Sequence, residues 1–170
     1  MIPHKDRVIF LDVDGVLTHQ AYGGDFRTSV APSCLALLNE LTDATGAGIV
    51  VSSAWRLLDR SMADLVGRFA RVGVTGKVVG RTPILNHIDG VGRRPGEIAE
   101  WLARRGPRGP RVAVALDDDI PDGAWLPEPV VLVRTEFAYG LQRRHVEAAL
   151  HVLLSDGGEG SVEPERCVAR

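Results

Sequence analysis

The chain has 170 residues, of which 45% are hydrophobic and 25% are charged, and its formal net charge is −2 at pH 7. This size and composition indicate one globular domain with a real core. The charge excludes a general attraction to nucleic acid or anionic membranes, while local basic patches remain open. Cys34 and Cys167 lie far apart in the sequence and offer neither a disulfide framework nor a CxxC metal pair.

The N-terminal residues, MIPHKDRVIF, lack the pattern of a signal peptide, and no apolar run has the length of a membrane span. We therefore expect a cytoplasmic protein that makes no contact with a membrane, and we infer no obligate protein partner.

Apolar runs alternate with helical patterns along the chain. Strands are expected at residues 7–12, 49–51, 77–80, 112–116 and 130–133. Helices are expected from Pro32 to just before Gly46, with Leu35, Leu37, Leu38 and Leu41 as its apolar stripe, and at residues 60–70, 97–105 and 141–154. This alternation predicts an α/β fold with a central, mainly parallel sheet and helices on both faces.

Two segments fall outside this alternation. The Gly23-Gly24 pair suggests a short hairpin over residues 22–27, whose Tyr22, Phe26 and Arg27 are placed to cover a site. From Ser155 onward the chain turns to Gly, Glu, Ser and Pro, which is typical of a flexible tail. We therefore expect one domain over residues 1–154 and a tail over residues 155–170.

Residues 8–18, VIFLDVDGVLT, are the most informative segment of the chain. The four apolar residues at 8–11 are typical of a strand in the middle of a parallel sheet. The run ends in Asp12 and Asp14, which in an extended chain point the same way, roughly 6.6 Å apart. Two desolvated carboxylates repel each other unless a cation or a shared proton compensates them, and Mg2+ is the hard cation that oxygen ligands favour.

Two other interpretations of this segment were weighed. An EF-hand calcium loop needs its glycine at the sixth position and a glutamate at the twelfth, whereas Gly15 stands fourth here and the twelfth residue is Gly23. An Asp-Gly pair also occurs in ordinary turns.

Three of the apolar strands end in polar residues of the kind that form sites. In a doubly wound sheet the carboxyl ends of the strands converge on one crevice. The residues expected to meet there are Asp12 and Asp14, then Ser52, then Asp117 and Asp118.

The DVDGVLT segment, residues 12–18, resembles the first motif of the haloacid dehalogenase superfamily, a hydrophobic strand followed by DxDG. The resemblance implies a three-layer Rossmann-like fold, with the short hairpin as a flap in place of a cap domain. It also implies that Asp12 is a nucleophile that takes up a phosphoryl group, that Asp14 is a general acid/base, and that Mg2+ bridges the site to the phosphate.

The IVVSSAWR segment, residues 49–56, resembles the second motif of this family. The resemblance implies that the Ser52 hydroxyl, with nearby backbone N–H groups, holds a phosphate oxygen. A helix cap is the alternative role of such a serine, above all for Ser53. Ser53 and Arg56 are further candidates for contact with substrate, although Arg56 also fits a pair with an acidic neighbour. Trp55 fits core packing better than substrate contact.

The VAVALDDD segment, residues 112–119, resembles the fourth motif, in which an acidic residue after the strand completes the Mg2+ shell. By position, Asp118 is the better ligand and Asp117 the supporting carboxylate, so the expected metal-binding residues are Asp12, Asp14, Asp118 and Asp117. Asp119 is expected to face solvent or a helix N-terminus.

The third motif of the family needs a lysine or arginine just before a helix. Arg93 and Arg94 precede Pro95, and we favour Arg94 because the basic residue of the family often stands directly before proline. The family more commonly uses lysine, but arginine carries a permanent charge and can supply the same electrostatic effect. For either arginine, an exposed charge near a helix N-terminus is the alternative. Arg93 is kept as a substrate-binding candidate.

Further segments look most like those of a compact subgroup that includes the phosphatase-like domains of Swiss Army Knife RNA repair proteins. These segments are SSAWR, EIAEWL, LDDD and GLQRRHVEAAL, within a resemblance over roughly residues 8–154. The implied activity is that of a Mg2+-dependent phosphatase acting through an aspartyl-phosphate on Asp12. Its phosphorylated substrate is a small molecule or a nucleic-acid end.

Three alternative functions remain open at this point. They are a polynucleotide-end phosphatase in nucleic-acid repair, a phosphotransferase that passes the group to an acceptor other than water, and a non-catalytic binding domain. The basic segment at residues 104–111 suits a polyanion, although a solvated turn between helix and strand is the simpler interpretation.

Overall fold

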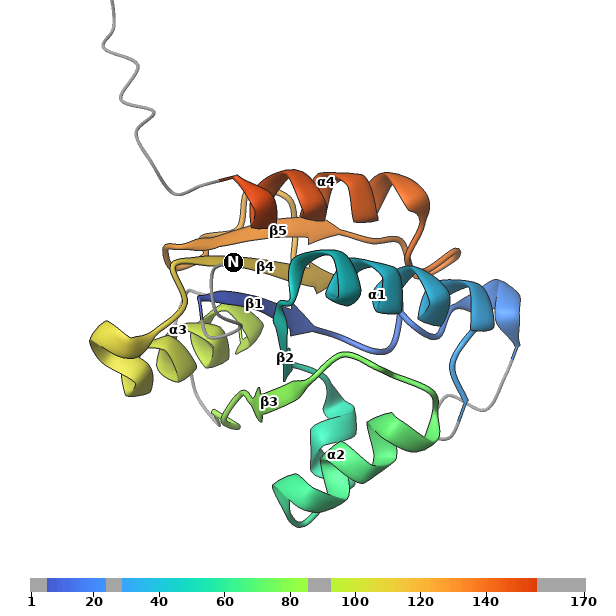
Figure 1. The fold of residues 1–170 in the computed structure, drawn as a ribbon, viewed down its shortest axis with the longest axis horizontal. Helices are drawn as coiled ribbons and strands as arrows, with labels where there is room; N and C mark the ends of the chain where they lie inside the picture. The colour runs from blue at the N-terminus through green and yellow to red at the C-terminus, as the bar shows by residue number, and fades with distance from the viewer. Residues whose placement is uncertain (1–5, 24–28, 86–92, 156–170) are drawn as a thin grey trace, which may run out of the picture.

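The computed structural model describes residues 6–23, 29–85 and 93–155. These residues form a five-stranded sheet whose neighbouring strands all run parallel, in the order β3-β2-β1-β4-β5 (Figure 1). The strands are β1 (Arg7–Leu11), β2 (Gly48–Val51), β3 (Val78–Arg81), β4 (Val112–Asp117) and β5 (Val130–Arg134). The strand order reverses between β1 and β4, and in such sheets ligands bind at the carboxyl ends of the strands beside that reversal.

Helices cover both faces of the sheet, so the expected three-layer α/β fold is confirmed (Figure 1). The helices are α1 (Pro32–Thr45), α2 (Met62–Arg71), α3 (Arg93–Arg105) and α4 (Arg143–Leu154), with short 3-10 turns η1 (Gln20–Tyr22), η2 (Ala54–Leu57) and η3 (Gly106–Arg108). Successive β1 residues enter opposite cores, because side chains alternate across a strand. Ile9 packs with α1, α2 and α4, whereas Phe10 packs with α3, edge-to-face against Trp101.

Helix α1 buries the expected apolar stripe only in part. Cys34, Leu38 and Leu41 are fully buried, whereas Leu35 and Leu37 are only half-buried. The buried positions follow the spacing of three and four residues that places side chains on one helix face. Cys34 therefore takes the core position that the leucine-based pattern missed.

Helix α3 begins four residues earlier than the expected start at Glu97. Pro95 does not prevent this, because its missing N–H falls in the first helical turn, where backbone N–H groups have no intrahelical acceptor. Arg93 and Arg94 therefore lie inside the first turn and not in a loop before it.

Parts of two predictions lie outside the described residues. Residues 20–22 form the turn η1 and Gly23 is left-handed with φ 63°, but the rest of the expected hairpin is not described. Helix α4 ends at Leu154, and the expected tail beyond Ser155 is also not described, so the domain boundary stays a prediction. No helix within the described ranges is long and apolar enough to cross a membrane.

Candidate active site

Backbone hydrogen bonds carry the sheet one residue past the ends of its central strands. The Asp12 N–H donates to the Leu116 carbonyl at 2.9 Å, and the Ser52 N–H donates to the Leu11 carbonyl at 2.8 Å. Asp117, the last residue of β4, lies in the next position along the same edge. The structure therefore brings the polar residues that follow β1 and β2 to one edge with the acidic end of β4.

Three carboxylates gather at this edge. One side-chain oxygen from each of Asp12, Asp117 and Asp118 lies within 4.8 Å of the others, and Asp12 and Asp117 are buried while Asp118 is half-buried. Such a group of charges in a dry setting is unfavourable without a compensating cation. Carboxylate oxygens are the ligands that Mg2+ prefers, so the donor set fits the expected cation.

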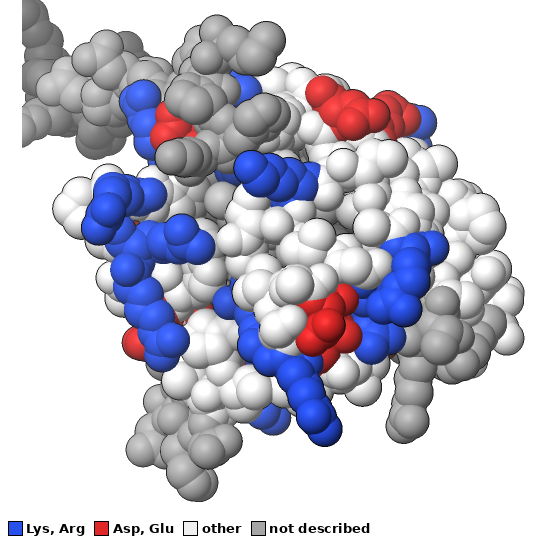
Figure 2. All heavy atoms as spheres, turned by 60° about the horizontal axis from the view of Figure 1, so that its bottom comes forward, with Lys and Arg blue, Asp and Glu red and all other residues white. Residues whose placement is uncertain are grey.

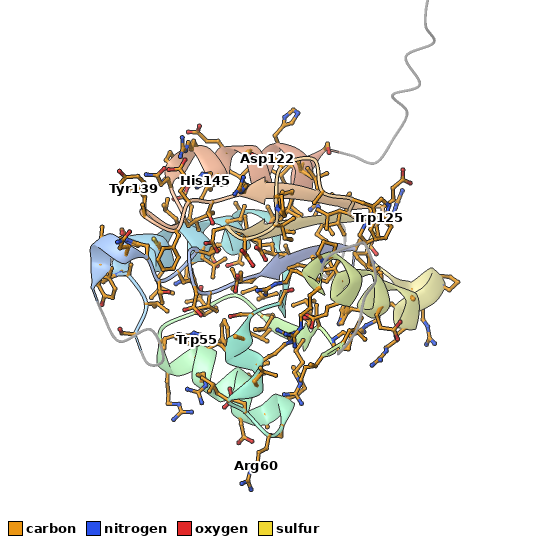
Figure 3. The ribbon with its side chains drawn as sticks, turned by 180° about the vertical axis from the view of Figure 1, so that it is seen from behind. Trp55, Arg60, Asp122, Trp125, Tyr139 and His145 are labelled. Atoms are coloured by element: carbon orange, nitrogen blue, oxygen red, sulfur yellow. The ribbon has the colours of Figure 1, made fainter. Side chains whose placement is uncertain are left out.

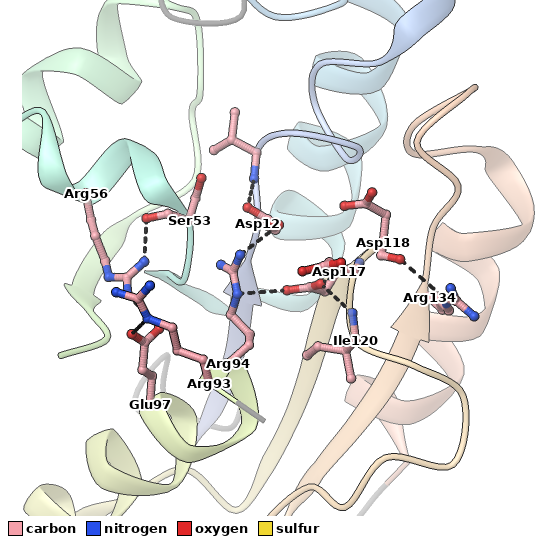
Figure 4. Close-up of polar contacts among 12 residues, drawn as sticks. Asp12, Ser53, Arg56, Arg93, Arg94, Glu97, Asp117, Asp118, Ile120 and Arg134 are labelled. Carbon is pink, nitrogen blue, oxygen red and sulfur yellow. Dashed lines mark hydrogen bonds and ion pairs between the residues drawn. The ribbon is translucent and has the colours of Figure 1, made fainter. Parts of the chain in front are cut away.

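Arg94 supplies positive charge to this cluster (Figure 4). Its Nη2 atom lies 3.2 Å from Asp12 Oδ2, and its Nε atom lies 3.4 Å from Asp117 Oδ2. Its third nitrogen, Nη1, is buried and has no hydrogen-bond partner among the described residues. Arg93, in contrast, has a 65% exposed side chain that pairs with Glu97 at 3.3 Å. Of the two candidate arginines, Arg94 is therefore the one that reaches the site.

The environment of Asp12 raises its pKa to about 7. Burial is the main cause, because it disfavours the charged carboxylate, and the Asp117 carboxylate adds to the effect. The Arg94 guanidinium, the Val13 N–H at 2.8 Å and the Ser53 hydroxyl act in the opposite direction. Burial also raises the pKa values of Asp117 and Asp118.

Asp14 does not join the carboxylate cluster. The chain leaves the strand after Leu11 and turns, with a hydrogen bond from the Gly15 N–H to the Thr18 carbonyl at 2.8 Å. Asp14 pairs with Thr18 in an isolated bridge outside the strands, and the expected geometry of Asp12 and Asp14 stays a prediction. The half-buried Asp14 carboxylate instead accepts a hydrogen bond from the Thr18 hydroxyl at 3.0 Å, and its side chain is not one of the grouped metal-binding candidates.

The two adjacent aspartates after β4 are held in different ways. Asp117 Oδ1 accepts hydrogen bonds from the backbone N–H groups of Asp119 and Ile120, at 2.9 and 3.0 Å, so its position is defined by the turn that follows. The Asp118 side chain occupies the space beside Gly15, where a Cβ atom would lie 2.1 Å from Asp118 Cγ. Asp119 is exposed, as expected.

The two serines after β2 have separate environments. Ser52 is 1% exposed, and its hydroxyl has no hydrogen-bond partner among the described residues. Ser53 accepts a hydrogen bond from the Trp55 N–H at 3.3 Å and so caps η2, in line with the alternative role considered for it. Trp55 is 3% exposed and packs against Phe69, which confirms a core position.

Arg56 is held by contacts inside the protein, in line with the acidic partner that we considered for it, and its contact with substrate stays a prediction. Its Nη2 atom lies 2.6 Å from the Glu97 carboxylate, and its other nitrogens donate to the carbonyls of Ser53 and Thr82 (Figure 4). Both side chains of the ion pair are at most 5% exposed. The pair joins η2, beside the two serines, to the first turns of α3, which carry Arg94.

Two residues of this edge escaped the sequence analysis. Glu97 is one, because nothing local distinguishes it from an ordinary helix glutamate. Thr82 is the other: its N–H donates to the Val51 carbonyl, and its buried hydroxyl has no partner among the described residues. As a polar residue directly after β3, Thr82 carries the same strand-end signal as Ser52.

A cleft of about 760 Å3 opens beside Arg94. It runs between the start of α3, the turn η2 and the loop that follows β4. Two of its lining residues expose large apolar surfaces, with Leu57 53% and Trp125 56% exposed. The cleft therefore offers an apolar wall next to the charged site.

The fit between Gly15 and Asp118 generates a prediction about cation binding. We expect Gly15→Ala to weaken Mg2+ binding by about 10- to 100-fold, because the new methyl group displaces the Asp118 carboxylate. Gly23→Ala is the matched control: Gly23 also has a positive φ, but a Cβ atom there meets nothing within 4 Å. Calorimetric titration with Mg2+ checks both variants, and equal affinities would contradict the role given to Gly15.

The raised pKa of Asp12 generates a prediction about stability. The folded protein keeps a proton on Asp12 that the unfolded chain loses from about pH 4 upward, so this group lowers stability as pH rises toward 7. Asp12→Asn removes this dependence, and we expect it to stabilise the cation-free protein at pH 8 by about 1–3 kcal/mol.

Urea unfolding in EDTA between pH 4 and 8 gives the free energy of unfolding of the wild type and of Asp12→Asn. The difference between the two values reports on Asp12, because both proteins share the other titrating groups. The difference should grow with pH and shrink when Mg2+ is added at pH 8. A difference that stays constant across this range would refute the assignment.

The sequence of this chain matches the model of one known domain family. A family model described as the HAD domain in Swiss Army Knife RNA repair proteins matches residues 8–146, which include every site residue described above. No curated protein and no solved structure matches the chain. The match covers well over half of the sequence and agrees with the motifs and the sheet order. The chain therefore belongs to the haloacid dehalogenase (HAD) domains of the Swiss Army Knife RNA repair type.

Proposed function

We propose that this protein is a Mg2+-dependent phosphomonoester hydrolase in which Asp12 is the nucleophile. The family implies a phosphatase-like activity in general. The observation that supports the specific proposal is the environment of Asp12, which lies beside the Arg94 guanidinium and two further carboxylates at the carboxyl edge of the sheet. One small site thus contains an anionic nucleophile, a fixed cation and potential metal ligands.

In the first step, a carboxylate oxygen of Asp12 attacks the phosphorus atom of the monoester in line with the leaving oxygen. The bond from phosphorus to that oxygen breaks, and Asp14 gives its proton to the departing alkoxide. In the second step, Asp14 takes a proton from water, and the water oxygen attacks the aspartyl-phosphate. The bond from phosphorus to Asp12 breaks, which releases inorganic phosphate and restores the Asp12 carboxylate and the protonated Asp14.

Arg94 and Ser52 are suited to hold the phosphoryl oxygens. Arg94 Nη1 and the Ser52 hydroxyl are buried polar groups without partners among the described residues, and such groups are costly unless a ligand satisfies them. Fixed donors of this kind stabilise charge that develops in a transition state. Within the described part of the chain, Thr82 offers a second unpaired hydroxyl directly after β3.

Asp12, Asp117 and Asp118 would hold Mg2+ at this site. The bound cation supplies positive charge that offsets the repulsion between the anionic nucleophile and the phosphate. The N–H groups of Val13 and Ile120 donate hydrogen bonds to Asp12 and Asp117 and so favour the charged form of these carboxylates, whose pKa values burial raises.

The cleft beside Arg94 is the proposed position of the leaving group. Its exposed Leu57 and Trp125 favour an organic group with an apolar or planar part over a small polar ester. A polynucleotide end is the specific alternative, and the description of the family supports it. A phosphotransferase would use the same nucleophile but release no free phosphate.

The assay that tests this proposal measures phosphate release from a panel of monoesters with and without Mg2+. We expect Asp12→Asn to reduce Mg2+-dependent turnover by about 1,000-fold or more, because no nucleophile remains. Asp14→Asn should slow turnover by about 100- to 10,000-fold while still permitting some phosphoenzyme to form from esters with good leaving groups.

The panel contains p-nitrophenyl phosphate, nucleotides, sugar phosphates and oligonucleotides with 3′- or 5′-phosphate ends. Circular dichroism confirms that each variant is folded. Full activity of Asp12→Asn would overturn the nucleophile, and full activity of Asp14→Asn would overturn the acid/base. Phosphoenzyme without phosphate release would favour a transferase.

The position of Trp125 generates a separate prediction about substrate choice. We expect Trp125→Ala to raise KM for a nucleoside monophosphate by about tenfold, because stacking of a base on an indole contributes about 1–3 kcal/mol. Glycerol phosphate, which has no ring, should be hydrolysed as before. Leu154→Ala is the control, since Leu154 is also an exposed apolar residue but lies at the end of α4 and does not line the cleft. Equal effects on both substrates would contradict this role of Trp125.

A further inference from the structure

A second cavity, of about 820 Å3, lies at the opposite edge of the sheet from Asp12. We call it the amino-edge groove, because it is formed where β1 and β3 begin and where α3 ends. Its lining residues are Val8, Lys77, Val78, Val79, Trp101, Arg104, Arg105, Arg108 and Pro110. The catalytic carboxylates and Arg94 are not among them, so the groove is separate from the proposed phosphatase site.

The polar side chains that line the groove are all cationic. Lys77, Arg104, Arg105 and Arg108 are exposed. Among the described residues only Arg104 of these four forms an ion pair, with Glu100 at 2.8 Å. Figure 2 shows a band of Lys and Arg side chains on the left of the molecule, where α3 and η3 lie. A local positive surface therefore exists on a protein whose net charge is −2.

One of these cations is held in a fixed orientation. The Arg105 guanidinium lies over the Trp101 ring, with its central carbon 4.6 Å from the ring centre, and Trp101 is 8% exposed. Gly80 permits this packing, because a Cβ atom there would lie 3.1 Å from Trp101 Nε1 and 3.6 Å from Arg105 Nη2. The stack buries one face of a planar guanidinium while Arg105 remains exposed, so the other face is available to a second planar group.

We propose that the amino-edge groove binds single-stranded nucleic acid. Lys77, Arg104 and Arg108 supply the positive charge that tracks a phosphate backbone, and Arg105 supplies a plane on which a base stacks. An anionic membrane fits less well, because the surface is hollowed and its valines are buried or half-buried. An acidic peptide also fits less well, because its carboxylate side chains have no ring that would stack on the guanidinium plane.

The test uses the full chain and a fluorescein-labelled 12-nucleotide oligouridylate, with binding followed by fluorescence anisotropy. We expect binding that weakens with salt, with a slope of log Kd against log salt concentration of about 2–3, which corresponds to three or four neutralised phosphates. The double variant Arg105→Ala/Arg108→Ala should weaken binding at least about tenfold, since it removes two cations and the stacking plane.

Two matched variants make the test specific. Arg105→Lys keeps the charge and removes the plane, so it should weaken binding by an amount between those of wild type and the double variant. Arg60→Ala/Arg71→Ala removes two exposed arginines that lie near the two ends of α2 and do not line the groove, and it should leave binding unchanged; Figure 3 shows Arg60 at the α2 end of the molecule. Hydrolysis of a small monoester should be the same in every groove variant, because none of these residues lies in the catalytic site.

Several results of this test would overturn the proposal or part of it. Absence of binding by the folded wild-type chain overturns the proposal, and so does an equal loss in the α2 control. Equal competition by anionic lipid vesicles or polyglutamate overturns the choice of ligand. Because the assay needs no turnover, its outcome is independent of whether the proposed phosphatase activity is found.

Discussion

The arrangement of this site depends on how the protein compensates the charges of three carboxylates that lie together at one edge of the sheet, largely shielded from water. Oxygens of Asp12, Asp117 and Asp118 lie within 4.8 Å of one another, and burial raises the pKa of each group. A protein keeps such an arrangement only if something compensates the charge. Here Arg94 provides one permanent positive charge, and backbone N–H groups donate hydrogen bonds to individual carboxylate oxygens. One cation does not balance three carboxylates, so the cluster is a good ligand set for a divalent cation.

A second buried ion pair keeps that compensation in place. Arg56 and Glu97 join the turn after β2 to the first turns of α3, and Arg94 lies three residues before Glu97 in the same helix. Loss of one partner of a buried pair typically costs about 3–5 kcal/mol, because the other charge is left without a counterion. The pair therefore connects the segment that carries Ser52 to the helix that carries Arg94, and it stabilises the relative position of the two groups proposed to hold phosphate.

The parallel sheet separates the proposed chemistry from the proposed binding surface. All strands point their carboxyl ends toward the same edge, so the strand-end residues and the loops after them form the proposed catalytic site and the cleft proposed for the leaving group. The opposite edge carries the end of α3 and the turn η3, where exposed arginines gather on a protein of slightly negative net charge. Helix α3 spans both regions, with Arg94 in its first turn and Arg105 at its last residue.

The sequence by itself determined the strand positions to within one residue, the three-layer fold and the place of Asp12 directly after β1, because apolar runs, helical periodicity and the DxDG motif are local signals. Only the tertiary structure decided between Arg93 and Arg94, because the direction of each side chain depends on a helix start that Pro95 obscured. It also placed Asp14 outside the carboxylate cluster and paired Arg56 with Glu97, 41 residues away. Such contacts arise from packing between distant elements, and no local pattern of residues encodes them.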